Sequence, residues 1–146
     1  MAVQSSIAEN KALARRFFEE VQTMDDIDTV DDIFAESYVH HDTNMPEPVR
    51  GRDAFKESLS QWMGGFSDAT MTVLDQVAEG DRVVSRVRME GSHDGPLQGM
   101  EPTNKHVEIE GIVEHRIENG RIVEGFPQWD IMGMMQQLGA MDDQRA

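Results

Sequence analysis

The pattern of apolar positions divides the chain into a helical first part and a β-rich second part. Between residues 6 and 21, apolar side chains recur every three or four positions, which predicts an amphipathic helix. A shorter helix is predicted over 25–35, where two aspartates in its first turn complement the positive end of the helix dipole. A third helix is predicted after Gly51, with one apolar face formed by Phe55, Leu59, Trp62, Met63 and Phe66.

From residue 68 onward, the apolar positions repeat every second residue instead. TMTVLDQVAEGDRVVSRVRMEGSHDG predicts two strands around the turn at residues 79–81. KHVEIEGIVEHRIENGRIVEGFPQWD predicts two more, joined at Asn119-Gly120, a strong hairpin signal. A methionine-rich helix then follows Asp130. Helices followed by an antiparallel meander predict an α+β fold with helices packed on one face of a curved sheet, in a single domain over residues 1–146.

Strand alternation separates the buried side chains from the exposed ones. In 105–117 the odd positions are apolar, and beyond the first residue His115 is their only polar member. In 83–93 the odd positions are again apolar and end in His93. In 122–130 neither set is uniformly apolar, and Pro127 is compatible with a bulge, so alternation does not fix which residues of this strand face inward.

His115 and Asp130 are the main candidates for chemistry, and each has a structural interpretation as well. A lone histidine on an apolar face is more often a hydrogen-bonded core residue than a catalyst, and a one-residue slip of the hairpin would put Arg116 in its place. An aspartate directly before a helix is an ordinary N-cap. The apolar stripe that includes Met134 and Met135 is typical of core packing, although methionine also suits the wall of an irregular cavity.

Other chemical motifs are absent from the sequence. The segment His40-His41-Asp42 contains metal-ligand types, but its spacing fits no recognised metal motif, so no metal site is predicted. With no cysteine in the chain, disulfides and thiolate nucleophiles are excluded. The sequence also has no phosphate-binding glycine loop, GxSxG elbow or HExxH motif.

The formal net charge of -15 limits the choice of partners. Repulsion from phosphate disfavours nucleic acid and anionic membranes, and no run of eighteen apolar residues is available to span a bilayer. The first residues lack the pattern of a secretory signal, so a cytoplasmic protein is expected. Only three basic residues, Lys11, Lys56 and Lys105, are lysines, and many carboxylates with few lysines are typical of adaptation to high salt.

Three segments of the chain resemble the SnoaL-like polyketide cyclase family, within the nuclear transport factor two-like superfamily. GSHDGPLQGMEPTNKHV at 91–107 is similar to the family's G-T-H-x-G followed by P-T-G-K. HRIENGRIVEGFPQWDIMGMMQQLG at 115–139 is similar to its R-x-x-D-G-K-I-x-E-x-W, then an aspartate and a helix ending in Q-L-G. YVHHD at 38–42 resembles its early histidine segment, and the resemblance covers about residues 8 to 140. Asn104 and Phe126 depart from the glycine and the tryptophan of these motifs.

The resemblance implies a cone-shaped α+β barrel with one internal pocket. In cyclases of this type, an aspartate at the start of the last helix is the acid/base of an intramolecular aldol closure, and no metal or organic cofactor takes part. Asp130 matches that aspartate by its place between the Gly-Arg-Ile-Val-Glu strand and the QLG helix. A histidine on the preceding strand accompanies it in some members, and His115 is the nearest candidate here.

The sequence therefore predicts a cofactor-independent cyclase or isomerase that acts on a small, apolar, carbonyl-bearing molecule. Burial of Asp130 would raise its pKa and make it a stronger base, while His115, His41 or His93 would hold the enolate oxygen or relay the proton. The remaining predicted pocket residues are Gln128, which would orient a carbonyl, and Phe126, Trp62 and Met134 in the wall.

Two other functions remain open at this stage. A non-catalytic pocket protein could bind the same kind of ligand, and a related hydrolase of esters or epoxides could use the same groups. A pairing function is compatible with each of them, because the outer face of a curved sheet is available for a homodimer contact.

Overall fold

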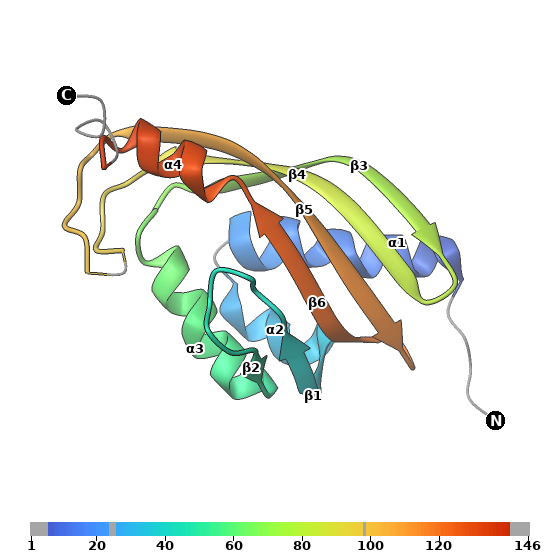
Figure 1. Cartoon of the computed structure of the whole chain (residues 1–146). Coiled ribbons are helices and arrows are strands. Elements are labelled where there is room, and N and C mark those ends of the chain that lie inside the picture. Colours follow the sequence, from blue (N-terminus) through green and yellow to red (C-terminus); the bar gives the residue numbers. More distant parts are fainter. Residues whose placement is uncertain (1–5, 24–25, 98, 141–146) are drawn as a thin grey trace.

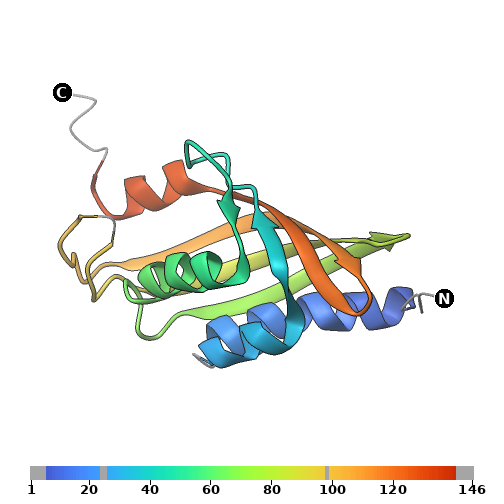
Figure 2. The same ribbon diagram turned by 90° about the horizontal axis from the view of Figure 1, so that it is seen from below.

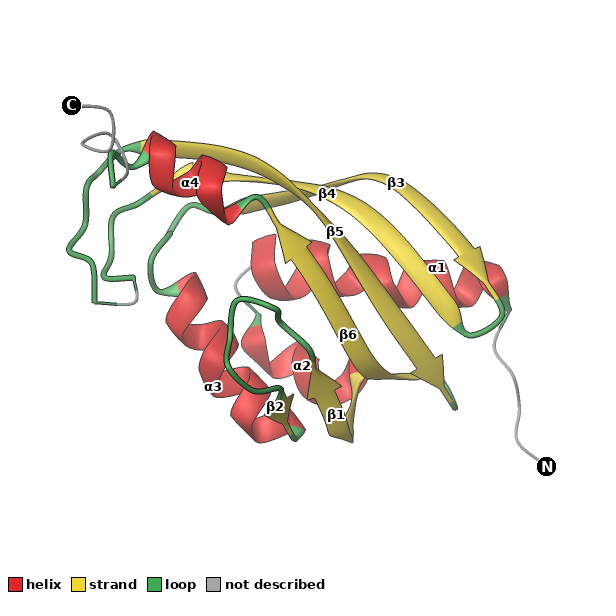
Figure 3. Cartoon of the chain, in the orientation of Figure 1, coloured by secondary structure: helices red, strands yellow, loops and turns green. Residues whose placement is uncertain are grey.

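The structure, a computed structural model, describes residues 6–23, 26–97 and 99–140. A curved six-stranded sheet covers three helices on its inner face, and a fourth helix follows the last strand (Figure 1; Figure 3). The helical segments are α1 (Ile7–Arg16), continued by π-helical turns (Phe17–Thr23), a 3-10 turn (Ile27–Thr29) leading into α2 (Val30–Ile33), α3 (Arg52–Met63) and α4 (Ile131–Gln137). The strands are β1 (Phe34–His40), β2 (Val49–Arg50), β3 (Thr70–Glu79), β4 (Arg82–Ser92), β5 (His106–Glu118) and β6 (Arg121–Trp129).

The strands lie in the order β2-β1-β6-β5-β4-β3. All neighbouring strands are antiparallel except β1 and β6, which are parallel. The predicted α+β class and the curved, cone-like sheet are confirmed, but the sheet is open rather than closed into a barrel, because β2 and β3 form separate edges. Seen from below, the helices lie across the concave side of the sheet (Figure 2).

Local sequence explains where the first helices begin and end. The hydroxyl of Ser6 accepts from the backbone N–H of Glu9 at 3.0 Å, and the Glu9 carboxylate accepts from the backbone N–H of Ser6 at 2.8 Å, which forms a capping box. The second predicted helix ends earlier than expected, at Ile33, because Phe34 adopts extended backbone and begins β1.

The core lies between the inner face of the sheet and the helices. The alternation predicted for 83–93 and 105–117 is confirmed, since every odd residue from 83 to 93 and from 107 to 117 is buried. Phe17 and Phe55 from the helical side pack against Phe34 of β1, with ring centroids 5.1 Å and 5.0 Å from that of Phe34. These rings pack on the concave side of the sheet, and Phe17 and Phe55 also line the cavity described below.

A bulge in β6 determines which residues of this strand point inward. In the pairing with β5, Arg116 lies opposite Glu124 and Ile117 opposite Ile122, so Val123 is the extra residue. Such a bulge reverses the alternation. Ile122 is therefore buried before the bulge, and Gly125 and Pro127 are buried after it.

Helix α4 is attached to the part of β5 that β6 does not cover. The backbone N–H of Asp130 donates to the Glu110 carbonyl at 3.2 Å. At Glu108, two residues before Glu110 on β5, the Gln137 side chain accepts from the backbone N–H at 2.7 Å and donates to the carbonyl at 2.9 Å. These contacts place Ile131, Met134 and Met135 against the cavity. No helix in the described ranges has the length and apolar character that a membrane crossing requires.

Candidate functional site

A cavity of about 260 Å³ lies between the inner face of the sheet, α3 and α4. Its wall is mostly apolar and aromatic, and it includes both tryptophans of the chain, Trp62 and Trp129. The polar side chains in its lining come from Gln22, Tyr38, His40, Asp42, Asn44, Ser58, Gln61 and His115. An apolar hollow with a few polar groups is typical of a small-molecule site.

His115 lines this cavity from the C-terminal half of β5, on the inner face that the alternation predicts. The side chain is 1% exposed and packs against the rings of Phe17 and Phe18, with centroids 5.8 Å and 5.9 Å away. Its Nδ1 is buried, and no described residue forms a hydrogen bond with it. Burial, with a smaller contribution from nearby His40, lowers the pKa of His115 to about 3, so the imidazole is uncharged at neutral pH.

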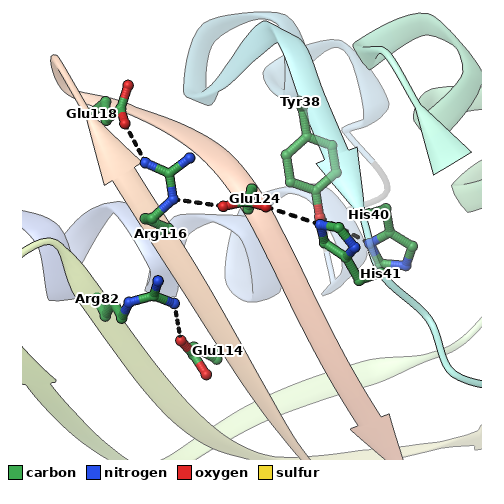
Figure 4. Close-up of polar contacts among 8 residues, drawn as sticks. All are labelled: Tyr38, His40, His41, Arg82, Glu114, Arg116, Glu118 and Glu124. Carbon is green, nitrogen blue, oxygen red and sulfur yellow. Dashed lines mark hydrogen bonds and ion pairs between the residues drawn. The ribbon is translucent and has the colours of Figure 1, made fainter. Parts of the chain in front are cut away.

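β1 and its continuation contribute three further polar side chains to the lining, a set that the sequence did not predict. Tyr38, His40 and Asp42 occupy alternate positions along β1 and its continuation, and all three line the cavity. The phenol oxygen of Tyr38 lies 2.9 Å from Nδ1 of His40 (Figure 4). Burial lowers the pKa of His40 to about 4 and raises the pKa of the Tyr38 phenol well above its usual range, so both groups are uncharged at neutral pH.

Asp42 is the only carboxylate among the described residues that line this cavity. Its Oδ1 accepts from the backbone N–H of Asn44 at 2.9 Å and from the Asn44 side-chain amide at 3.2 Å. Within the described part of the chain, Oδ2 has no hydrogen bond. The sequence signal for this group was the spacing of Tyr38, His40 and Asp42, but adjacent histidines and a short strand obscured the alternation.

Asp130 does not line this cavity, and its predicted burial is wrong. The residue is exposed, and its carboxylate accepts from the backbone N–H of Gly133 at 2.9 Å, as the N-cap of α4. The physical reason is that β6 ends at Trp129, so the chain turns outward into the helix before Asp130 can point under the sheet. The geometry therefore favours the interpretation of Asp130 as a helix N-cap.

His41 and Phe126, both expected in the pocket, lie on the outer face of the sheet instead. Their rings stack with centroids 4.6 Å apart and an interplanar angle of 5°. Nε2 of His41 lies 3.0 Å from a carboxylate oxygen of Glu124, and Glu124 also pairs with Arg116 at 2.6 Å (Figure 4). Arg116 thus faces outward, and His115, not Arg116, occupies the inner position.

Gln128 is also on the outer side of β6. It is exposed, and its side-chain oxygen lies 3.5 Å from the Thr43 hydroxyl. The bulge at Val123 explains this error together with that of Phe126, because it moves the even residues of β6 outward. The odd residue Trp129 lines the cavity in their place, and Trp62 and Met134 line it too.

His93 is buried but belongs to the core rather than to this cavity. Its Nδ1 accepts from the backbone N–H of Thr103 at 3.2 Å and lies 3.0 Å from the Thr103 hydroxyl. Its backbone is held by Asn104 and Lys105, through bonds of 2.7 Å and 2.9 Å. The two family-like segments, GSHDG and PTNK, are therefore joined to each other, which gives His93 a structural role.

The metal-ligand types in His40-His41-Asp42 do not converge, because His40 and Asp42 face the cavity while His41 faces outward. Among the described residues, one other group of three potential ligands, Glu90, His106 and Glu108, lies on the outer surface with its ligand atoms within 4.8 Å of one another. These side chains are partly or fully exposed, and exposed carboxylates commonly gather without an ion.

The chain belongs to the SnoaL-like polyketide cyclase family, whose sequence profile matches residues 12–138. Among solved structures, it is similar to a proposed SnoaL-like polyketide cyclase from Jannaschia sp. CCS1, with 22% identity, a TM-score of 0.86, and coverage of 96% of this chain and 99% of that one. TsrD from Streptomyces laurentii has 25% identity, a TM-score of 0.83 and coverage of 94% and 99%.

A third similar structure is IdmH from Streptomyces antibioticus, a proposed polyketide cyclase. It has 28% identity, a TM-score of 0.77, and coverage of 89% of this chain and 98% of that one. None of the curated proteins compared matches the sequence. The family and these structures support a cyclase or isomerase type of function and a small-molecule ligand.

Proposed function

We propose that the protein is a proton-transfer enzyme of the cyclase or isomerase type, acting on a small, apolar, carbonyl-bearing molecule in the cavity. The observation that carries this proposal is that Asp42, His40 and His115 line a cavity whose wall is mostly apolar and aromatic. Membership of the SnoaL-like family and similarity to IdmH support it. The proposal involves no metal or organic cofactor.

The chemistry requires a base for a proton next to the carbonyl and a donor for the oxygen that becomes negative. Asp42 supplies the carboxylate for the first role, because its Oδ1 is bonded to Asn44 whereas its Oδ2 has no hydrogen-bond partner in the described chain. Uncharged imidazoles, such as those of His40 and His115, can donate an N–H to an enolate oxygen without adding a charge to the cavity. Aldol closure and double-bond migration both begin with this proton transfer.

Hydrogen–deuterium exchange tests the proposal without knowledge of the natural substrate. 1-Tetralone is a bicyclic ketone with exchangeable protons next to its carbonyl, and it suits a cavity near the lower end of the usual range of about 300–1,000 Å³. The protein should accelerate the exchange of these protons in D₂O, followed by NMR. Asp42→Asn should reduce the acceleration by roughly a hundredfold or more, which is typical of a lost general base.

The matched comparison is Asp130→Asn, because asparagine also caps helices and removes only the carboxylate. Asp130→Asn should leave the exchange rate unchanged. A loss of exchange in Asp130→Asn, with Asp42→Asn unaffected, would overturn the role of Asp42 and restore Asp130 as the base that the sequence predicts. No acceleration by the unmodified protein would overturn the enzymatic proposal for ketones of this class.

A non-catalytic ligand-binding protein is the second candidate. The low pKa values of His40 and His115 favour it, because an imidazole with a pKa near 3 or 4 is a weak base. Binding of 1-tetralone without exchange would support this function. The fluorescence of Trp62 and Trp129 reports such binding directly, since both tryptophans of the chain line the cavity.

We also infer that the outer face of the sheet forms a homodimer contact. Ile112 is 48% exposed and Val77 is 66% exposed on this face, which also carries the half-buried Phe126. Ile112→Glu should convert a dimer into a monomer in light scattering after size-exclusion chromatography. Met132→Glu, at a 62% exposed position on α4, is the control and should leave the dimer intact. A monomeric unmodified protein would contradict the inference.

A further inference from the structure

The phenol of Tyr38 is fixed in position by its surroundings. The side chain is 1% exposed, and its ring centroid lies 4.7 Å from those of both Phe34 and Phe55. Gly125 on β6 leaves room for the hydroxyl, because a Cβ at that position would lie only 2.1 Å from the phenol oxygen. The phenol oxygen therefore has little freedom to choose another hydrogen-bond partner.

Within the described chain, that partner is Nδ1 of His40, 2.9 Å away. A buried hydroxyl that fails to donate its proton loses a hydrogen bond at considerable cost, so the phenol donates and Nδ1 accepts. Burial keeps the pKa of Tyr38 high and that of His40 low, which is consistent with this direction. In an uncharged imidazole only one nitrogen carries hydrogen, and for His40 that nitrogen is Nε2.

We propose that Tyr38 locks His40 as an Nε2–H donor and thereby builds a subsite in the cavity for the carbonyl or enolate oxygen of the ligand. His40 lines the cavity, and no described residue forms a hydrogen bond with its Nε2. Tyr38 is a positioning residue in this subsite, because it acts through His40. The subsite depends on the proposed function only in requiring a carbonyl-bearing ligand, and it does not require catalysis.

The subsite predicts selectivity for ligands with an oxygen acceptor. In an apolar environment, a donor left without a partner is costly. A ligand that lacks the oxygen makes no hydrogen bond to His40 and leaves the Nε2–H without a partner. The matched probes are 1-tetralone and tetralin, which share the ring skeleton and differ by a carbonyl in place of a methylene. The ketone should bind roughly tenfold or more tightly, the change expected from one such hydrogen bond.

The first measurement needs no ligand. ¹⁵N NMR of the imidazole rings should show hydrogen on Nε2 of His40 and none on Nδ1, and the Tyr38→Phe variant should lose this fixed tautomer. The opposite tautomer in the unmodified protein would overturn the proposal. This measurement on the unmodified protein decides the question even if Tyr38→Phe fails to fold.

The second measurement compares the two probes by tryptophan fluorescence and follows the carbonyl stretch of bound 1-tetralone by infrared spectroscopy. The stretch should shift to lower frequency in the unmodified protein, and both the shift and the selectivity should decrease in Tyr38→Phe and disappear in His40→Phe. Equal affinities for the two probes, or no binding of 1-tetralone, would overturn the subsite. Selectivity without hydrogen–deuterium exchange would leave the subsite standing and reject only the enzymatic proposal.

Discussion

His40 and His41 are neighbours in the sequence, yet they lie on opposite faces of the sheet and in opposite environments. His40 faces an apolar cavity, is bonded to the uncharged Tyr38, and has its pKa lowered to about 4 by burial. His41 faces outward, stacks on Phe126 and contacts the Glu124 carboxylate. The same contrast recurs at His115 and Arg116 on β5.

This contrast separates two kinds of polar chemistry within one layer of backbone. On the inner face, burial keeps His40, His115 and Tyr38 uncharged, so these side chains act through hydrogen bonds between uncharged partners. On the outer face, carboxylates and guanidinium groups pair in solvent, as in Arg116 with Glu118 and Glu124, or Arg82 with Glu114 (Figure 4). A replacement on the inner face should therefore change stability and ligand binding, whereas one on the outer face should have small effects.

The largest effect is expected from Gly125→Ala on the inner face. The new methyl group would overlap the phenol oxygen of Tyr38, and such overpacking costs about 3 kcal/mol of unfolding free energy. Urea denaturation measures this loss. The control is Gly133→Ala, where the overlapping atom belongs to the exposed Asp130 side chain, so the cost should not exceed about 1 kcal/mol, the value of an N-cap. Equal losses in the two variants would contradict the prediction.

Acid should have the next largest effect, through the buried histidines. An unfolded histidine takes up a proton below its usual pKa of about 6.5, but folded His115 stays uncharged down to about pH 3. Protons therefore favour the unfolded chain, and stability is complete above the unfolded pKa and falls as the pH falls through this window. His115 alone should account for about 2 kcal/mol of unfolding free energy between about pH 7.5 and about pH 5.

The measurement is urea unfolding at the two pH values. His115→Phe should reduce the pH dependence clearly, because phenylalanine does not titrate. His41→Gln is the matched control on the outer face and should preserve most of the dependence. An unmodified protein that is equally stable at both pH values would show that the inner histidines are not held in their uncharged form.

Salt should act mainly through the outer face, because the cavity wall has few charges. With a net charge of -15, repulsion between exposed carboxylates opposes folding, and added salt screens it. Raising KCl from about 0.1 M to about 1 M should increase stability by roughly 1 kcal/mol, as measured by thermal unfolding. This result would support the predicted adaptation to high salt, and a decrease in stability would argue against it.

The smallest effect is expected from Arg116→Ala, which removes two ion pairs on the outer face. Many exposed pairs contribute nothing measurable, so the variant should lose less than about 1 kcal/mol at low salt, and the loss should shrink as KCl is added. Hydrogen–deuterium exchange in 1-tetralone should not change. A loss as large as that of Gly125→Ala would mean that the two faces do not differ as described.

Much of the fold could be predicted because the alternation of buried and exposed residues is unbroken in β4 and β5. The alternation of β4 and β5 identified the buried residues, including His115, and Asn119-Gly120 marked the hairpin. Both residues of that turn have positive φ angles, 52° and 75°, which is the conformation that such a pair favours. Family resemblance then gave the cone-like arrangement, apart from its closure.

The site was predicted less well, and particular residues explain the errors. One extra residue, Val123, reverses the alternation of β6, so Phe126 and Gln128 were expected inside and Trp129 was overlooked. Asp130 carries two compatible signals, a family motif and an N-cap, and its position after the end of the sheet decides between them. Tyr38 and His40 lie on the short strand β1 and Asp42 on its continuation, where alternation has too few repeats to be recognised.

The two hydrogen bonds between the Gln137 side chain and the backbone of Glu108 affect how this edge of the sheet can contact other molecules. β5 extends past the end of β6, and an uncovered length of strand can recruit a strand from another molecule. One side-chain amide presents the same donor and acceptor as a peptide group, so it occupies the site where such a strand would attach. We therefore expect a single glutamine, Gln137, to protect this edge against pairing with a strand of a neighbouring molecule.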